Sequence, residues 1–531
     1  MDKTHMWAFE SDVLVIGGGM AAAWAAISAA REGASVTLVD KGFVGTSGVT
    51  ATGGPNHWWV PPDPARREAA IRRRLETAYG LADADWMARV IDVTWRTLPD
   101  LAAYYPFSGD GQGGTYYSGV RGPDYMRGLR RYALALGVRV LDHHPALELL
   151  ARPDGSIGGA AGYARLQRQS WTARAGAVIL ATGGCAFRSG LIGSHNNTGD
   201  GYLMGVEAGA ELSGMEFCVA YSISPAWAST RTLPYTGARF FDAEGRLLDI
   251  PSPLAQRDYL CALARAFAQG PVFADLHEAP EFLRTVIRKI QPATPTPFER
   301  RGLDMFRDRF PVALYGEGTI RGTGGLRITD GACQTSVPGL YAAGDAATRE
   351  LVAGATSGGG AQNAAWALAS GVLAGSGAAS LALILGKGGR HGPLTALGQA
   401  GLRPRATSRP VDDQAAIGLA RHHILDLDQA LWRNAESLTT ARAELNAAWA
   451  EIQDHRRGDG LGLVAAREAA AMTATARWCN AAALARTESR GMHVRTDVPA
   501  AMPAHDGRLL VDGLDRIRTR FETAGTKANA A

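Results

Sequence analysis

Short apolar runs that end in small residues recur along this chain of 531 residues. Residues 13–16 stop at Gly17 and lead into an alanine-rich stretch, and a second run stops at Asp40. Two later runs end at residues 181–184 and at residues 344–345. Four or five apolar residues that end in small ones are typical of a buried parallel strand whose carboxyl end meets a ligand. The pattern therefore predicts buried strands followed by glycine turns.

The first of these turns predicts a dinucleotide site. Gly17 permits the tight turn, Gly19 lets the backbone approach a pyrophosphate, and Ala22 takes the third small position, where helix meets sheet. The N-terminus of the following helix would face the phosphate. Asp40, about twenty residues on, is placed to accept hydrogen bonds from a ribose diol. Strand context and the acidic residue favour this interpretation over an ordinary glycine-rich turn.

Helical periodicity appears in the last third of the chain. Beyond a connector at residues 386–410, apolar residues such as Leu425, Leu431 and Leu438 recur at three- and four-residue spacing. The uncharged stretch at residues 367–385 is long enough to look membrane-like, but it is rich in Ala, Gly and Ser. We therefore expect a buried helix there and no membrane span.

Composition excludes several classes of protein. With 46% hydrophobic and 20% charged residues, and a length that predicts two to four domains, the chain is not disordered. The net charge of +4 comes from basic and acidic residues that are interspersed along the chain, so no basic surface for nucleic acid is expected. Five cysteines without a C-x-x-C pair encode neither an iron–sulfur cluster nor a zinc finger. The short first apolar run is not a secretory signal, so we expect a cytoplasmic protein.

The order of the motifs is specific. G-x-G-x-x-A at residues 17–22, A-T-G-G at 181–184 and G-L-Y-A-A-G-D at 339–345 resemble the FAD-binding domain of the fumarate reductase and succinate dehydrogenase flavoprotein family. That family includes L-aspartate oxidase and adenylylsulfate reductase flavoproteins. N-T-G-D-G at residues 197–201 and E-S-R-G-M-H at residues 488–493 extend the resemblance along nearly the whole chain. It implies an FAD-dependent oxidoreductase.

The resemblance also implies an α/β fold in three parts. Residues 1–235 and 318–392 would form a discontinuous, doubly wound FAD-binding domain. Residues 236–317 would form an inserted α+β capping domain. Residues 393–531 would form a helical C-terminal domain with a frayed tail.

The glycine turns and the resemblance together assign a set of FAD contacts. They are Gly17, Gly19, Met20, Ala21, Ala22, Asp40, Lys41, Thr46, Ser47, Gly53, Gly54, Ala181, Thr182, Gly183, Asn197, Thr198, Asp200, Gly344, Asp345, Ser357 and Gly359. Covalent-flavin members carry a histidine where this chain has Ser47. No flavin link through that side chain is possible, so we expect noncovalent FAD, as in the aspartate oxidase and adenylylsulfate reductase branches.

Residues on the substrate side depart from the family pattern. Tyr221 and Ile320 stand where relatives that use dicarboxylates have histidines, and Ser357 stands where they have an arginine. Two substrate carboxylates would then be poorly compensated, at a cost of several kcal/mol. This argues against fumarate or succinate as the substrate.

Five residues are candidates for substrate chemistry. The resemblance identifies Arg257 with the residue that exchanges a proton with substrate, although a guanidinium with a pKa above about 12 favours an anion clamp; an ordinary ion pair is the alternative. Tyr221 is a candidate proton donor or a packed core residue. Arg321 is either a replacement for the lost arginine or a surface charge. Ser357, at the position of that arginine, is a further candidate for substrate contact. His195 either touches flavin or substrate, or is structural.

Three functions remain open. The leading one is hydride transfer between the flavin N5 and a nonstandard small-molecule substrate, with oxygen, a quinone or a small ferredoxin-like carrier as the electron-transfer partner. The second is the flavoprotein subunit of a two-component reductase that exchanges electrons with an iron–sulfur partner. The third is a catalytically inactive FAD-binding homologue, and the presence of Arg257 argues against it.

Overall fold

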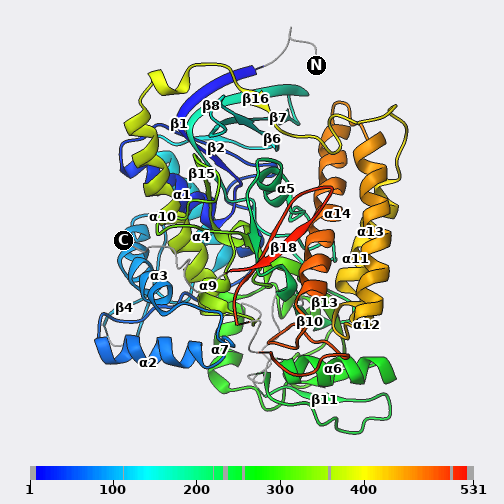
Figure 1. Ribbon diagram of the computed structural model, residues 1–531. Coiled ribbons are helices and arrows are strands. Elements are labelled where there is room, and N and C mark those ends of the chain that lie inside the picture. The colour runs from blue at the N-terminus through cyan, green and yellow to red at the C-terminus, as the bar shows by residue number, and fades with distance from the viewer. Residues whose placement is uncertain are drawn as a thin grey trace.

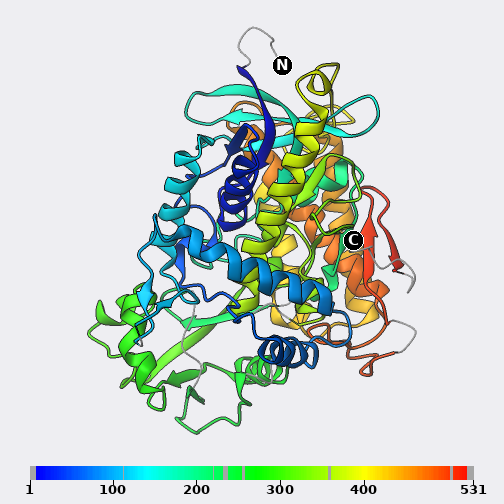
Figure 2. The same ribbon diagram turned by 90° about the vertical axis from the view of Figure 1, so that its left-hand side faces the viewer.

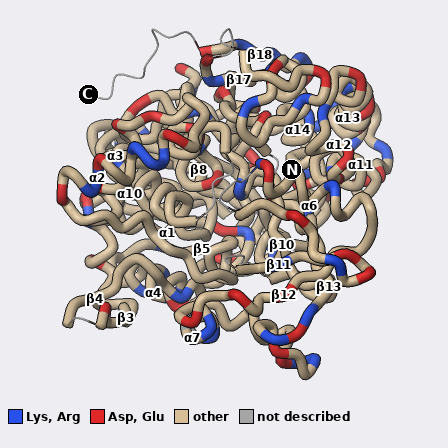
Figure 3. The backbone as a smooth tube through the Cα atoms, turned by 90° about the horizontal axis from the view of Figure 1, so that it is seen from below, with Lys and Arg blue, Asp and Glu red and all other residues tan. Residues whose placement is uncertain are grey.

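The computed structural model describes residues 7–111, 113–218, 220–230, 237–253, 257–356, 360–502 and 506–522, with the side chains of residues 286, 289 and 290 left aside. Figures 1 and 2 show three regions: a large sheet with its helices, a smaller α+β region below it, and a column of long helices along one side. Lys and Arg positions are interspersed with Asp and Glu positions along the backbone in the view from below (Figure 3).

The large sheet has the strand order β16-β6-β7-β8-β1-β2-β5, and β15 pairs with the end of β8. Its strands are β1 (Trp7–Ile16), β2 (Val36–Val39), β5 (Arg139–Leu141), β6 (Ala146–Ala151), β7 (Ile157–Ala164), β8 (Gln169–Leu180), β15 (Leu340–Ala342) and β16 (Thr395–Ala396). β15, β8, β1, β2 and β5 are parallel, whereas β16, β6 and β7 join them as an antiparallel extension. The predicted run at residues 13–16 is the end of β1, and the predicted run that stops at Asp40 contains β2. The two strands are adjacent and parallel, so their carboxyl ends meet at one edge.

Two helices pack on each other against this sheet. α1 (Met20–Arg31) follows the first glycine turn. α10 (Ala361–Leu385) packs so closely on α1 that a Cβ at Gly371 would lie 2.5 Å from the carbonyl oxygen of Ala21. α10 is long and apolar enough to cross a membrane, but half of its most apolar window is buried within the protein. The remaining elements around the sheet are α2 (Pro64–Leu75), α3 (Ala84–Thr97), α4 (Gly122–Ala135), α5 (Asp200–Glu207), α9 (Glu350–Ala353), β3 (Ser108–Gly109), β4 (Thr115–Tyr116) and the 3₁₀ turns η2 (Val49–Thr52), η3 (Leu98–Leu101), η4 (Met215–Phe217), η6 (Gly318–Ile320), η7 (Gly344–Ala346) and η8 (Gly388–Arg390).

The capping region has a separate apolar core, which includes Phe240, Leu263, Phe298 and Phe310. Its sheet has the order β10-β13-β12-β11. The elements are β10 (Tyr221–Pro225), β11 (Arg239–Phe241), α6 (Arg257–Gln269), β12 (Phe273–Asp275), α7 (Glu281–Ile290), α8 (Thr296–Glu299) and β13 (Phe310–Gly316). β10 pairs with β13 although it lies within the range expected for the FAD-binding domain. The domain boundaries stay predictions.

The C-terminal region is helical but ends in two strands. Its elements are α11 (Asp413–Leu425), α12 (Leu427–Ala430), α13 (Ala435–His455), α14 (Gly462–Ala485), β17 (Leu509–Asp512) and β18 (Arg518–Phe521). β17 pairs with β9 (Leu212–Ser213), which pairs in turn with β14 (Gly325–Leu326). These strands tie residues 509–521 to the FAD-binding region, a contact that helical periodicity does not predict.

Candidate functional site

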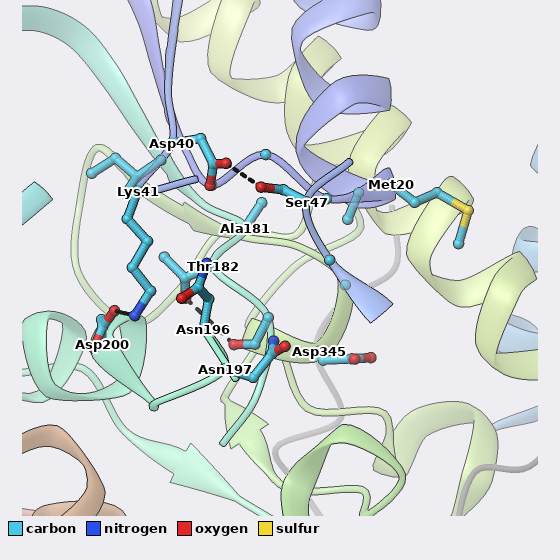
Figure 4. A pocket seen from close by; sticks show the side chains of 18 of the residues that line it. Met20, Asp40, Lys41, Ser47, Ala181, Thr182, Asn196, Asn197, Asp200 and Asp345 are labelled. Carbon is cyan, nitrogen blue, oxygen red and sulfur yellow. Dashed lines mark hydrogen bonds and ion pairs between the residues drawn. The ribbon is translucent and has the colours of Figure 1, made fainter. Parts of the chain in front are cut away.

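A pocket lies at the edge where the parallel strands of the large sheet end (Figure 4). Fourteen of the predicted FAD contacts line it: Gly17, Gly19, Met20, Ala21, Asp40, Lys41, Ser47, Ala181, Thr182, Gly183, Asn197, Asp200, Gly344 and Asp345. Residues that the sequence did not single out also line it, among them Asn196, Pro145 and Met204. Turns far apart in the sequence are therefore brought together around one cavity.

The other predicted contacts lie beside the pocket or outside the described residues. Thr46 is exposed, and its hydroxyl donates to the Phe43 carbonyl at 3.2 Å. Ala22 is fully buried within α1, and the carbonyl of Gly53 accepts the Gly122 amide at 2.9 Å. The carbonyl of Gly54 accepts the side-chain amide of Gln291 at 3.4 Å, and the Thr198 hydroxyl accepts from the Lys41 ammonium at 2.6 Å. Ser357 and Gly359 lie outside the described residues.

The first glycine turn has the conformation that a phosphate site requires. Gly17 has φ of +124°, and a Cβ there would lie 2.2 Å from the carbonyl oxygen of Ala181. Gly19 is the N-cap of α1 and offers no side-chain cap, and the space around its Cα is open. The first amides of α1 are therefore free to bind an anion, which the helix dipole favours.

Asp40 is held against this turn by a contact that the sequence did not predict. Its carboxylate accepts a hydrogen bond from the Ser47 hydroxyl and another from the Gly42 amide at 3.1 Å (Figure 4). Burial raises the pKa of Asp40, and the two hydrogen bonds offset part of that rise. A Cβ at Gly18 would overlap the carboxyl carbon at 2.4 Å, so the carboxylate lies directly beside the glycine turn. Ser47 thus orients the carboxylate that is predicted to accept hydrogen bonds from the ribose.

Lys41 joins the pocket to the C-terminal region. Its ammonium donates to Thr198 Oγ1 at 2.6 Å, to Asp200 Oδ2 at 2.7 Å and to Glu468 Oε1 at 2.9 Å. Burial lowers the pKa of Lys41, but the two carboxylates outweigh it and the pKa is raised. Glu468 on α14 also pairs with Arg188. No local sequence signal pointed to Glu468, because its partner lies at the other end of the chain.

Helix α10 holds the third glycine turn. The Gly344 amide donates to Ser370 Oγ at 2.9 Å, and the Trp366 indole donates to the Gly344 carbonyl at 3.0 Å. Gly344 has φ of +66°, and a Cβ there would lie 2.7 Å from that of Ala21. The turn is fixed from both sides, through two α10 residues that sequence reasoning missed.

Neither Tyr221 nor Arg257 lines this pocket. The Tyr221 hydroxyl donates to the Leu425 carbonyl at 2.7 Å and packs against the C-terminal helices, as the structural alternative expects. Arg257 begins α6, is about one-third exposed, and lies 3.5 Å from Asp258. This contact is the ion pair that was the alternative to a catalytic role.

The remaining substrate-side candidates are also engaged elsewhere or exposed. Arg321 pairs with the buried carboxylate of Glu317 at 3.2 Å, and His195 is exposed outside the pocket lining. Ile320 is 2% exposed, and its carbonyl accepts the buried guanidinium of Arg349 at 2.7 Å. Arg349, which the sequence did not single out, also pairs with Asp345 and so fixes this segment against the pocket.

The residues present fit FAD. An uncapped helix N-terminus, a tight glycine turn before it and a buried carboxylate beside that turn are the groups that bind a pyrophosphate and a ribose. These features and the mixed α/β fold define an FAD-dependent oxidoreductase.

Comparison with known proteins gives the family. Residues 12–362 match the family described as FAD binding domain, and residues 422–511 match the family described as fumarate reductase flavoprotein C-term. The chain belongs to the FAD-binding family that these two matches define, as the motifs predicted.

Similar proteins span almost the whole chain. L-aspartate oxidase of Mycobacterium tuberculosis is 29% identical over 561 aligned residues, with 96% of each chain covered. One subunit of the fumarate reductase (CoM/CoB) of Methanothermobacter marburgensis is 25% identical, with 95% of this chain and 97% of that protein covered. The solved structure of E. coli quinol fumarate reductase has a TM-score of 0.81 at 20% identity, with 97% of each chain covered, and shows the shared fold.

Proposed function

We propose that this protein transfers a hydride between the flavin N5 and an organic substrate other than fumarate or succinate. The observation that carries the proposal is the environment of Ile320. It is a buried aliphatic side chain at a position where relatives that use dicarboxylates have a histidine, and Arg349 holds its backbone in place. Leaving a substrate carboxylate without its partner costs about 1–3 kcal/mol or more.

Tyr221 supports the same proposal. Tyr221 stands at the other of the two positions where relatives that use dicarboxylates have histidines, and its hydroxyl donates to the Leu425 carbonyl at 2.7 Å. A side chain so committed is a poor replacement for a carboxylate-binding imidazole. The substrate therefore carries fewer anionic groups on this side than a dicarboxylate does.

Bound FAD supplies the electron-accepting and electron-donating chemistry. The glycine turns at Gly17 and Gly344 position it, and Asp40, oriented by Ser47, binds the ribose. We assign substrate contact to Arg257, whose guanidinium is one-third exposed and has one carboxylate at 3.5 Å. A permanently charged guanidinium at that position would bind an anionic or carbonyl oxygen of substrate.

We further propose noncovalent FAD, a cytoplasmic location, and oxygen, a quinone or a ferredoxin-like carrier as the electron-transfer partner. A second candidate function is the flavoprotein subunit of a two-component reductase. The similarity to one subunit of a fumarate reductase favours it. Any iron–sulfur cluster would then lie on another chain, because the described residues hold five free buried cysteines and no group of metal ligands.

The test is anaerobic photoreduction of the purified flavoprotein, followed by addition of one acceptor at a time while the flavin absorbance is recorded. We expect fumarate to leave the reduced flavin bleached. Rapid recovery with oxygen alone would identify an oxidase, and recovery only with a copurifying ferredoxin-like subunit would favour the two-component reductase. Reoxidation by fumarate at a catalytic rate would overturn the proposal.

A further inference from the structure

Two buried cysteines meet where the turn η4 packs against helix α14. Cys218 follows Phe217 at the end of η4, and Cys479 lies on α14. Cys218 is 1% exposed and Cys479 is fully buried. Their side chains share a hydrogen bond. Neither residue lines the flavin pocket, and the proposed reaction uses neither of them.

Arg433 brings a buried positive charge to this pair. The residue is 3% exposed, and its guanidinium donates to the Glu216 carbonyl oxygen at 2.7 Å and to Cys218 Sγ at 3.5 Å. It also donates to Nδ1 of His493 at 2.8 Å. The carboxylate of Glu216 pairs instead with Arg486. Within the part of the chain that the structure describes, no carboxylate forms an ion pair with Arg433.

The imidazole beside Arg433 carries no compensating charge. His493 Nε2 lies 3.0 Å from the Arg486 carbonyl, which can only accept, so Nε2 holds the proton and Nδ1 accepts from Arg433. Burial lowers the pKa of His493, and the charge of Arg433 lowers it further. A guanidinium keeps its proton in proteins, and a buried charge without a counter-ion is costly. Of the described side chains that contact Arg433, Cys218 is the one that can become an anion.

Cys218 is therefore the thiolate of the pair. The hydrogen bond from Cys479 and the charge of Arg433 lower the pKa of Cys218, against the opposing effect of burial. The same contact with Cys218, together with burial, raises the pKa of Cys479, which stays a thiol. A thiolate next to a thiol is the arrangement that a peroxide oxidises to a disulfide.

The other three cysteines lack this environment. Burial raises the pKa of Cys185, Cys261 and Cys333, so each is a neutral thiol. Cys261, at 7%, is nevertheless the most exposed of the five. Exposure and thiolate character thus favour different cysteines, Cys261 and Cys218, which makes the two causes of reactivity separable.

We propose that Cys218 and Cys479 form a redox-active dithiol that hydrogen peroxide converts to a disulfide. The Cys218 thiolate attacks one peroxide oxygen, the O–O bond breaks, and hydroxide leaves a sulfenic acid on Cys218. The Cys479 sulfur then gives up its proton and bonds to the Cys218 sulfur, and the S–O bond breaks with loss of water. The two sulfurs lose two electrons and the peroxide gains them.

The burial of both sulfurs selects a small oxidant. Hydrogen peroxide enters during local opening of the structure, whereas bulky thiol reagents are excluded. Closure of the disulfide links η4 in the FAD-binding region covalently to α14 in the C-terminal region. It also removes the anion beside Arg433, so the oxidised form is reversible by a reducing thiol.

The test is treatment of the FAD-loaded protein with a small excess of hydrogen peroxide, ended with catalase. The protein is then denatured in an alkylating reagent, and its peptides are analysed by mass spectrometry. We expect a disulfide between Cys218 and Cys479, loss of two alkylated thiols, and recovery of both with dithiothreitol. The other three cysteines should remain fully alkylated.

Cysteine variants separate the two steps. In Cys479→Ser the sulfenic acid on Cys218 cannot close to a disulfide, so denaturation in the presence of dimedone should trap it. Cys218→Ser should give no dimedone adduct on Cys479. Cys333→Ser, which removes a buried cysteine from another part of the chain, is the matched control and should form the disulfide as the unmodified protein does.

Arg433 variants test the origin of the thiolate. Arg433→Gln should slow disulfide formation by about tenfold, the change in thiolate fraction for one pKa unit, whereas Arg433→Lys keeps the charge and should lose less. The cysteine variants decide the matter if Arg433→Gln does not fold. Oxidation of Cys261 before Cys218 would show that exposure governs reactivity and would overturn the proposal. Five intact thiols after peroxide treatment would overturn it as well.

Discussion

The ammonium of Lys41 lies 2.9 Å from the carboxylate of Glu468, across 427 residues of sequence. The pair joins the wall of the flavin pocket to helix α14. Both side chains are 12% exposed, so the charges are largely removed from water. Removing one member of such a pair is costly, because the other charge stays buried.

We therefore expect Glu468→Gln to lower the stability of the FAD-loaded protein by about 1–3 kcal/mol and to weaken FAD binding. Asp200 still faces Lys41 in the variant, which limits the loss. Urea unfolding and titration of the apoprotein with FAD would measure the two effects. Glu451→Gln, which removes a surface partner of Arg409, is the control. Equal behaviour of the two variants would show that the Lys41 contact does not support the pocket.

Gly344 and Gly386 offer a comparison of two glycines with nearly the same φ, +66° and +61°. An alanine at either position is strained by about 1–3 kcal/mol, because residues other than glycine rarely adopt a positive φ. At Gly344 the new methyl group would also meet Ala21 at 2.7 Å, whereas Gly386 has no neighbour within 4 Å. We expect Gly344→Ala to lose FAD affinity and more stability than Gly386→Ala does. Fluorescence titration with FAD and thermal unfolding would check both, and equal FAD affinities would refute the role of the Gly344 turn.

His57 is buried in a network without a counter-charge. Its Nδ1 lies 3.2 Å from the Ser118 carbonyl, which can only accept, so Nε2 accepts from the Tyr125 hydroxyl at 3.3 Å. The Trp24 indole donates to the same hydroxyl at 2.8 Å. Burial lowers the pKa of His57 to about 4. The native state therefore holds this imidazole neutral.

The lowered pKa predicts a loss of stability in acid. The unfolded chain takes up a proton at about pH 6.5 and the native state only near pH 4, so stability falls as the pH drops through this window, by up to about 3 kcal/mol. His57→Gln should reduce the slope of unfolding free energy against pH, whereas His195→Gln, at an exposed histidine, should leave it unchanged. Urea unfolding at several pH values would measure the slopes. An unaltered slope in His57→Gln would contradict the assignment.

The presence of Ser47 predicts that FAD is released when the protein is denatured. A serine hydroxyl hydrogen-bonded to Asp40 forms no bond to the flavin ring, so acid precipitation should release all FAD into the supernatant. Absorbance of the supernatant and of the washed pellet would measure the partition. Yellow colour retained by the denatured pellet would show a covalent link at some other residue.

The cofactor pocket could be predicted from the sequence because its parts are local. Gly17, Asp40, Ala181 and Gly344 each follow an apolar run, and the carboxyl ends of neighbouring parallel strands meet at one edge. The family resemblance placed the remaining turns. In each strand–turn unit the cofactor-binding residue thus lies next to the apolar run that predicts it.

What supports that pocket could not be predicted in the same way. Glu468, Trp366 and Ser370 reach it from distant helices, and the bond between Ser47 and Asp40 depends on how the intervening loop folds. These partners have ordinary helix-compatible residue types and no motif of their own. Long-range packing alone brings them to the site.

Arg257 gives the sharpest test of the substrate side. If it contacts substrate, Arg257→Ala should bind FAD normally and lose at least about 100-fold in turnover, the scale expected for a group acting at the reacting centre. Arg257→Lys keeps the charge but not the planar guanidinium and should recover only part of the rate. Once a substrate is found, steady-state kinetics and FAD titration would measure the two properties separately. Arg265→Ala, on the same helix with its guanidinium over Trp432, is the control for damage to α6. Full turnover in Arg257→Ala would assign Arg257 to the ion pair with Asp258 alone, and the residue that contacts substrate would then have to come from another element of the chain.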